Sequence, residues 1–216
     1  MTQAALASAL ERGCQALELA LTAEQQGLLL EYLQLFVKWN RAYNLSAVRA
    51  IEEMVGRHLL DSLSVLTYLE SSDSKRFIDV GTGGGLPGIP LAICLPHWHW
   101  TLLDSNGKKT RFLIEVKSRL GLENVTVLNQ RVETLLPEPA FDGVISRAFA
   151  SLADMVAGCR HLLNDSGALW AMKGQFPEQE LAELPADIEL AQTWPLSVPG
   201  EAGQRHLLQL VPKNAG

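Results

Sequence analysis

The chain has 216 residues, of which 47% are hydrophobic and 19% charged, and its formal net charge is −6 at pH 7. This length fits one domain, or one domain with an appendage, and the composition excludes a disordered or fibrous protein. The negative charge argues against tight binding to naked nucleic acid.

The charge is unevenly distributed along the chain. Residues 38–119 hold eleven Lys or Arg against eight acids, or +3, whereas residues 174–216 hold six acids against two basic residues, or −4. A local basic face that binds RNA and an ordinary scatter of charge explain this pattern equally well.

The three cysteines, Cys14, Cys94 and Cys159, are scattered and fit neither a disulfide framework nor a metal site. We therefore expect a reducing compartment and no bound metal. The N-terminus lacks the basic start and apolar core of a signal peptide, and the longest uncharged run, residues 80–103, is broken by glycines and prolines. A cytoplasmic protein that does not span a membrane is expected.

Residues 1–70 are predicted to form a helical extension, and residues 71–216 a second domain. Thr22 and Gln25 fit a capping box that opens a helix with an apolar face. Apolar residues from Ile51 to Leu66 predict a second helix, and the polar residues 71–75 a connector.

A strand over residues 76–80 is followed by a glycine-rich turn and a helix near 88–95. The glycines fall at Gly81, Gly83 and Gly85, and Leu86 stands where a dinucleotide fingerprint needs its third glycine. A nicotinamide dehydrogenase is therefore the least favoured reading. The D-x-G-x-G-x-G spacing that begins at Asp79 resembles motif I of class I S-adenosylmethionine-dependent methyltransferases.

Asp104 ends the next predicted strand, residues 100–104. In the methyltransferases that the motif resembles, an acid at this place accepts hydrogen bonds from the ribose hydroxyls. The glycine turn and Asp104 together therefore predict a site for S-adenosylmethionine.

Strands and helices alternate from residue 76 onward. Further strands are predicted near 125–128, 141–146, 167–172, 188–193 and 206–211, and further helices near 108–120, 151–163 and 177–184. This order predicts an α/β fold: a mostly parallel seven-stranded sheet with helices on both faces, Rossmann-like and preceded by a small helical cap. The last two strands lie too close together for a crossover, so an antiparallel end is expected.

The segments after the third, fourth and fifth strands are expected to meet at one crevice. In a methyltransferase, Val132 and Glu133 would contact adenine; alternatively they form an ordinary solvated turn. Arg147 would contact the target base, or hold a loop or the cofactor carboxylate. Lys173 would bind phosphate or be solvated.

The fourth strand lacks features of other methyl acceptors. No Asn-Pro-Pro-Tyr-type segment is present to bind an exocyclic amine, and no cysteine to attack a pyrimidine. The Ser146–Arg147 pair instead suits an acceptor that is already nucleophilic, such as guanine N7, which needs no general base.

Several segments together resemble the ribosomal RNA small-subunit methyltransferase G family, also called glucose-inhibited division protein B. The likeness covers about residues 25–175, and the segments that carry it are residues 39–46, 57–63, 81–92, 104–109, 131–133 and 146–149. Ser46 and Val132 stand where the family commonly has Thr and Ala. The likeness is lower over the last 40 residues, which include Arg205 and His206.

The resemblance implies methylation of N7 of one guanine in the 530 loop of 16S rRNA, with S-adenosylmethionine as cofactor. It implies cofactor contacts at Gly81, Leu86, Val132, Glu133 and Arg147, to which the residue pattern adds Asp79, Gly83, Gly85 and Asp104. The candidate catalytic residues are Arg147, Lys173, Asn44 and His58.

The polar residues of the helical extension allow two readings. Asn44, Arg57, His58 and Asp61 either present the guanine or fasten the helices to the sheet, and the second reading is favoured for Asp61.

The partner implied is 16S rRNA, naked or within the 30S subunit or an assembly intermediate, and the expected state is a monomer. Two alternatives remain: a methyltransferase for a small molecule or protein, and a non-enzymatic assembly or signalling factor that keeps a cofactor fold.

Overall fold

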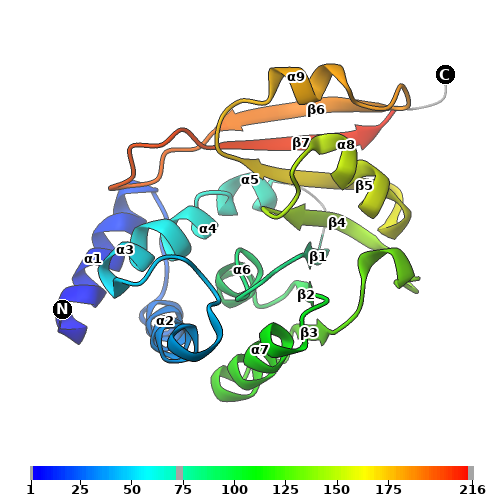
Figure 1. Ribbon diagram of the computed structural model, residues 1–216. Coiled ribbons are helices and arrows are strands. Elements are labelled where there is room, and N and C mark those ends of the chain that lie inside the picture. The colour runs from blue at the N-terminus through cyan, green and yellow to red at the C-terminus, as the bar shows by residue number, and fades with distance from the viewer. Residues whose placement is uncertain (1, 72–74, 214–216) are drawn as a thin grey trace.

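The computed structural model describes residues 2–71 and 75–213 and contains one seven-stranded sheet with the order β3-β2-β1-β4-β5-β7-β6 (Figure 1). The strands β1 to β5 pair with parallel neighbours, and β7 pairs antiparallel with both β5 and β6. This confirms the predicted α/β fold and its antiparallel end. The strands are β1 Arg76–Val80, β2 His99–Leu103, β3 Val125–Leu128, β4 Phe141–Ser146, β5 Leu163–Lys173, β6 Ile188–Pro195 and β7 His206–Pro212.

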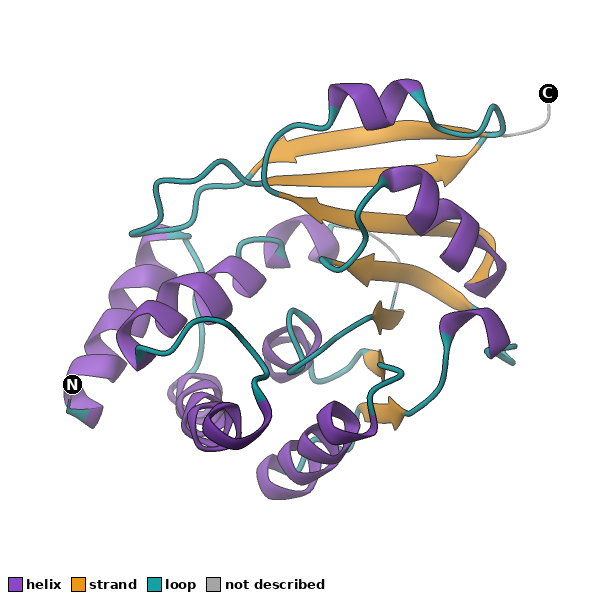
Figure 2. Ribbon diagram, viewed as in Figure 1, coloured by secondary structure: helices purple, strands orange, loops and turns teal. Residues whose placement is uncertain are grey.

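Helices cover both faces of the sheet (Figure 2). Because side chains alternate along a strand, Phe77 of β1 points into one layer and Ile78 into the other. The Phe77 layer holds α1 Gln3–Ala16, α2 Ala23–Tyr43, α3 Ile51–Met54, α4 Asp61–Leu63, α5 Leu66–Glu70, α6 Gly88–Cys94 and α7 Gly107–Leu120. The Ile78 layer holds α8 Leu152–Cys159 and α9 Glu178–Ala182.

The helix α2 begins where the sequence predicts. The Thr22 hydroxyl accepts a hydrogen bond from the Gln25 backbone N–H, and the Gln25 side chain accepts one from the Thr22 N–H, so the capping box is complete.

The single helix predicted from Ile51 to Leu66 is wrong. The segment divides into α3, a π-helix over Val55–Leu60, α4 and, after a turn, α5. In and just after this π-helix, His58 and Asp61 are buried, and Leu59 and Leu60 pack into the apolar core.

β5 is longer than predicted. It begins at Leu163, where it pairs with Phe141 of β4, and the helix predicted over 151–163 therefore ends earlier, with a final 3-10 turn over Arg160–Leu162. Pairing with a neighbouring strand overrode the local helical pattern at this point.

The N-terminal helices and the sheet share one continuous apolar core. The proposed division at residues 70 and 71 stays a prediction, and the predicted connector includes residues 72–74, which lie outside the described residues. Among the described residues, every helix is too short or too polar to cross a bilayer.

Candidate active site

Two adjoining cavities lie at the carboxyl ends of the parallel strands, where ligands bind in open α/β sheets. The larger, of about 350 Å³, is lined by Asp104, Val132 and Glu133 among others. The smaller, of about 200 Å³, is lined by His58 and Arg147 among others. Both cavities include Gly81 and Ala148, so they share one wall.

The glycine turn after β1 forms that shared wall. Gly81, Gly83 and Gly85 have φ angles of 70°, 61° and 93°, a region that side chains disfavour. A Cβ on Gly81 would lie 2.8 Å from the Ala148 Cβ, whereas a Cβ on Gly83 would meet nothing nearer than 4.0 Å. Gly81 therefore allows close packing, and Gly83 leaves room beside the backbone for a ligand.

Gly83 and Leu86 line the smaller cavity, as a cofactor-binding role requires. Gly85 lines neither cavity, because its backbone packs against Ile89 and Leu113. Its place in the motif is explained by its positive φ angle and this close packing.

Asp79 is fully buried behind the turn and lines neither cavity. Its Oδ2 accepts hydrogen bonds from the Thr82 hydroxyl at 2.7 Å and the Gly88 N–H at 2.9 Å. Burial raises the pKa of this carboxyl to about 6, although the two hydrogen bonds oppose the shift. Asp79 thus shapes the turn from behind.

Asp104 joins the turn to the next loop. Its Oδ2 accepts from the Gly83 N–H at 3.0 Å and lies 3.4 Å from the Lys109 ammonium, while its Oδ1 accepts from the Asn106 N–H at 2.8 Å. The side chain is nearly buried but borders the larger cavity. Its lone pairs suit two neighbouring hydroxyl donors, as on a ribose.

Val132 and Glu133 begin a 3-10 helix, Val132–Thr134, that follows β3. Both residues line the cavity, and their contact with adenine stays a prediction. Arg131 and Phe149 also border it, although the sequence pattern predicts no role for either residue.

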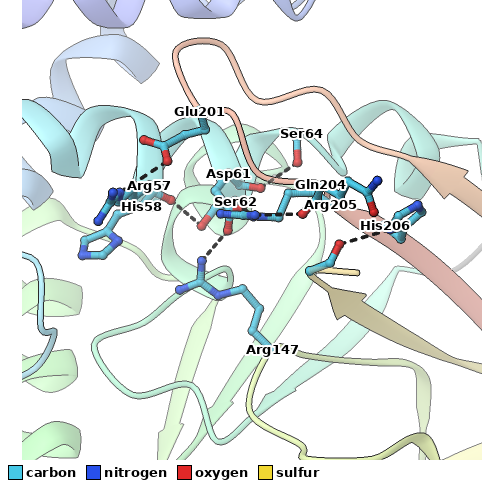
Figure 3. A network of polar contacts seen from close by, with 11 residues as sticks. Arg57, His58, Asp61, Ser62, Ser64, Arg147, Glu201, Gln204, Arg205 and His206 are labelled. Carbon is cyan, nitrogen blue, oxygen red and sulfur yellow. Dashed lines mark hydrogen bonds and ion pairs between the residues drawn. The ribbon is translucent and has the colours of Figure 1, made fainter. Parts of the chain in front are cut away.

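Arg147 follows β4 and reaches across to the helical cap (Figure 3). Its Nη1 donates to Asp61 Oδ2 at 2.5 Å, and Asp61 Oδ1 accepts from Arg205 Nε at 3.1 Å. The preceding Ser146 hydroxyl donates to the Val80 carbonyl at 2.7 Å and accepts from the Ala148 N–H at 3.0 Å, which fixes the loop. Arg147 therefore borders the smaller cavity as an ion-paired guanidinium.

His58 borders the same cavity from the π-helix. Its Nε2 lies 2.9 Å from the Ser46 hydroxyl, and its ring packs on Phe36 with 5.2 Å between centroids. Burial, together with the nearby Arg147 charge, lowers the pKa of this imidazole. The lowered pKa favours the neutral form of the imidazole.

Asn44 and Lys173 lie outside both cavities. Asn44 is exposed, ends α2 in a left-handed conformation, and accepts from Arg49 Nη2 at 2.7 Å. The Lys173 ammonium pairs with Glu180 at 2.8 Å and donates to the Ala150 carbonyl at 3.1 Å. A phosphate could bind Lys173 only by competing with these contacts, and catalytic roles for both residues stay predictions.

Tyr32 and Phe36 of α2 support the glycine turn, a role that the sequence did not reveal. The buried Tyr32 hydroxyl donates to the Gly84 carbonyl at 2.7 Å, and a Cβ on Gly84 would lie 2.3 Å from Phe36. Both side chains read as ordinary core positions in a helical pattern, so no local signal distinguished them. The helical cap thus braces the glycine turn directly.

A family model described as rRNA small subunit methyltransferase G matches residues 25–208. The chain belongs to this family. Ribosomal RNA small subunit methyltransferase G of Saccharophagus degradans is 57% identical over 194 residues, which cover 90% of this chain and 86% of that protein. The protein of the same name from Cellvibrio japonicus is 59% identical over 187 residues, 86% of this chain and 85% of that one.

Solved structures of other methyltransferases share the fold of this methyltransferase G chain. Mitomycin 7-O-methyltransferase MmcR aligns with a TM-score of 0.63 at 13% identity, over 74% of this chain and 56% of that one. A SAM-dependent methyltransferase from Aquifex aeolicus aligns with a TM-score of 0.55 at 18% identity, over 71% of this chain and 90% of that one. This family membership and fold imply use of S-adenosylmethionine.

The described part of this methyltransferase G chain contains no cluster of three or more His, Cys, Asp or Glu side chains that could hold a metal ion. The three cysteines are buried apart from the site, and burial raises the pKa of each thiol, to about 11 for Cys14 and about 12 for Cys94 and Cys159.

Proposed function

We propose that this protein transfers the methyl group of S-adenosylmethionine to N7 of a guanine in the 530 loop of 16S rRNA. The observation that carries the proposal is the pair of adjoining cavities. One offers a carboxylate suited to a ribose, and the other offers an arginine and a histidine. The family match from residue 25 to 208 supports the substrate class.

The residues present fit this cofactor. Asp104 would bind the ribose hydroxyls, Val132 and Glu133 would contact the adenine, and the open space beside Gly83 would admit the methionine end. Leu86 and Arg147 border the smaller cavity, where the methionine end would lie beside the target base. When bound, S-adenosylmethionine supplies an electrophilic methyl group.

The chain's own residues suit an acceptor that has no proton to lose. Guanine N7 carries a free lone pair, so the site needs orientation rather than a general base. Arg147 can donate to an acceptor on the base, such as O6, while Asp61 offsets its charge. This offset matters because methylation at N7 leaves the base cationic.

We further propose that the protein acts as a monomer in the cytoplasm on the 30S subunit or an assembly intermediate. The acidic net charge of −6 supports a structured ribosomal substrate over naked RNA, because nonspecific attraction to phosphate is weak.

The deciding experiment is nucleoside mass spectrometry of 16S rRNA from cells with and without the gene. We expect one 7-methylguanosine to disappear, and purified protein with S-adenosylmethionine to restore it on mutant 30S subunits. Naked 16S rRNA, a protein extract and a metabolite pool serve as parallel acceptors. An unchanged nucleoside profile would reject the rRNA assignment, and methyl transfer to a metabolite or protein alone would replace it.

A further inference from the structure

Asp61 sits where three distant parts of the chain meet (Figure 3). It follows the π-helix of the cap, Arg147 follows β4, and Arg205 precedes β7. Arg147 Nη1 lies 2.5 Å from Asp61 Oδ2, and Arg205 Nε lies 3.1 Å from Asp61 Oδ1. Each carboxylate oxygen of this nearly buried side chain therefore holds a different arginine.

The arrangement leaves most of the Arg147 guanidinium available. Within residues 2–71 and 75–213, Asp61 is the hydrogen-bond and ion-pair partner found for Arg147, through one of its five N–H donors. The same guanidinium borders the smaller cavity. Pairing at one nitrogen restricts where the guanidinium lies, and the remaining donors can serve a ligand.

A purely fastening role for Asp61 would duplicate a contact that already exists. Arg57 of the π-helix pairs with Glu201 at 3.3 Å, and this pair joins the same part of the cap to the same loop between β6 and β7. The Arg57–Glu201 pair is more exposed and does not include Arg147. Asp61 therefore contacts the arginine that borders the cavity, Arg147, whereas the Arg57–Glu201 pair does not.

We infer that Asp61 is a positioning residue for methyl transfer. One oxygen orients Arg147 toward the target base, and the other is anchored by Arg205, so the β6–β7 loop contributes to the geometry of the site. This inference rests on the proposed function, because it assigns Asp61 a part in that reaction.

The test compares Asp61→Asn with Glu201→Gln as a matched control. Both changes remove one carboxylate that joins the cap to the β6–β7 loop, and the asparagine keeps the size of the side chain but presents N–H to one of its two arginines. Methyl transfer from labelled S-adenosylmethionine to undermethylated 30S subunits gives kcat and KM for both substrates, and thermal melting reports folding.

For Asp61→Asn we expect kcat to fall about 10- to 100-fold, with both KM values changed less than about threefold, because orientation acts on the transition state. For Glu201→Gln we expect kcat within about twofold of wild type, as for a loosely held surface pair. Equal losses of kcat in the two variants, or a loss confined to KM, would overturn the inference.

A second variant covers the case in which Asp61→Asn does not fold. Arg205→Gln leaves the Asp61–Arg147 pair but removes the anchor of the other oxygen, and it should lower kcat about 3- to 10-fold. An unchanged kcat in that variant would overturn the inference. Failure of the wild-type protein to methylate 30S subunits would instead reject the proposed function.

Discussion

The site has two sides that are held in different ways: a first wall on the cofactor side, with Asp79 and Asp104, and a second wall on the side of the cap, with Asp61. On the cofactor side, the donors to Asp79 and Asp104 are near in sequence. Asp79 accepts hydrogen bonds from Thr82 and Gly88, 3 and 9 positions away. Asp104 accepts from Asn106 and Gly83, 2 and 21 positions away. On the side of the cap, Asp61 reaches across 86 positions to Arg147 and 144 to Arg205. The first wall is local in sequence and the second is not.

The difference also concerns the kind of donor. Asp79 and Asp104 accept mainly from backbone N–H groups, which the glycine turn and the next loop present as soon as β1 and β2 pair. Asp61 accepts from two long side chains that meet only after the cap and β7 have packed. We therefore expect changes in the first wall to act on cofactor binding, and changes in the second to act on transfer.

Arg147→Ala should have the largest effect. We expect kcat for transfer to 30S subunits to fall about 100- to 1,000-fold, the usual cost of losing one well-placed donor at the reacting centre. Calorimetry should show cofactor affinity changed far less. Arg160→Ala, which removes an exposed arginine paired with Asp187 on the other face, is the control and should keep normal turnover. Near-normal turnover of Arg147→Ala would make Arg147 structural.

Asp79→Asn tests whether burial raises the pKa of the Asp79 carboxyl in the folded protein. The folded pKa of about 6 lies above the ordinary value of 3.8, so Asp79 stabilises the fold most below about pH 4, and this contribution is lost as pH rises through 6. Between pH 4 and pH 8 we expect the free energy of unfolding of wild type to fall by about 2 kcal/mol relative to the variant.

Denaturant unfolding at the two pH values measures this change. Taking the difference from Asp79→Asn cancels the other titrating groups, including His58, whose lowered pKa acts in the opposite direction. A pH-independent difference would show that Asp79 keeps an ordinary pKa.

Asp104→Ala should weaken cofactor binding by about 1–3 kcal/mol, through lost hydrogen bonds to the ligand and to the Gly83 N–H. Calorimetric titration with S-adenosylmethionine gives the dissociation constant. Asp142→Ala is the control, because that carboxylate also accepts from backbone N–H groups but at the opposite end of β1. An unchanged dissociation constant in Asp104→Ala would remove Asp104 from the cofactor site.

Tyr32→Phe should have the smallest effect. It tests the contact by which the helical cap supports the glycine turn. Loss of the hydroxyl leaves the buried Gly84 carbonyl without this donor, and we expect the free energy of unfolding to fall by about 1–2 kcal/mol. The cofactor dissociation constant should rise about two- to fivefold as the turn loosens. Tyr43→Phe, at an exposed position of the same helix, should change neither quantity. Unaltered cofactor binding in Tyr32→Phe would show that this contact from the cap does not affect the cofactor site.

The sequence predicted most of the sheet and the first wall. The bounds of β1, β3 and β4 match the predicted ranges, because their short apolar runs end in glycine or polar residues. Gly81, Gly83, Asp104, Val132 and Glu133 could also be placed, since each follows a parallel strand and such strands end at one edge.

The cap resisted prediction for a physical reason. Hydrophobic periodicity reports which face of a helix is buried but not where its winding changes, so the π-helix over Val55–Leu60 was read as an ordinary helix. Likewise, nothing near Tyr32 in the sequence reports that its hydroxyl meets Gly84, 52 positions further on.

The sequence by itself determined the α/β fold, the family and the turn that shapes the cofactor side, because those features depend on residue order over short distances. Only the tertiary structure decided that Asp61 would hold Arg147 and Arg205 together, and that Lys173 would pair with Glu180. Charged side chains have many possible partners along a chain. Which of them pair depends on how the cap, β4 and the β6–β7 loop pack around one point.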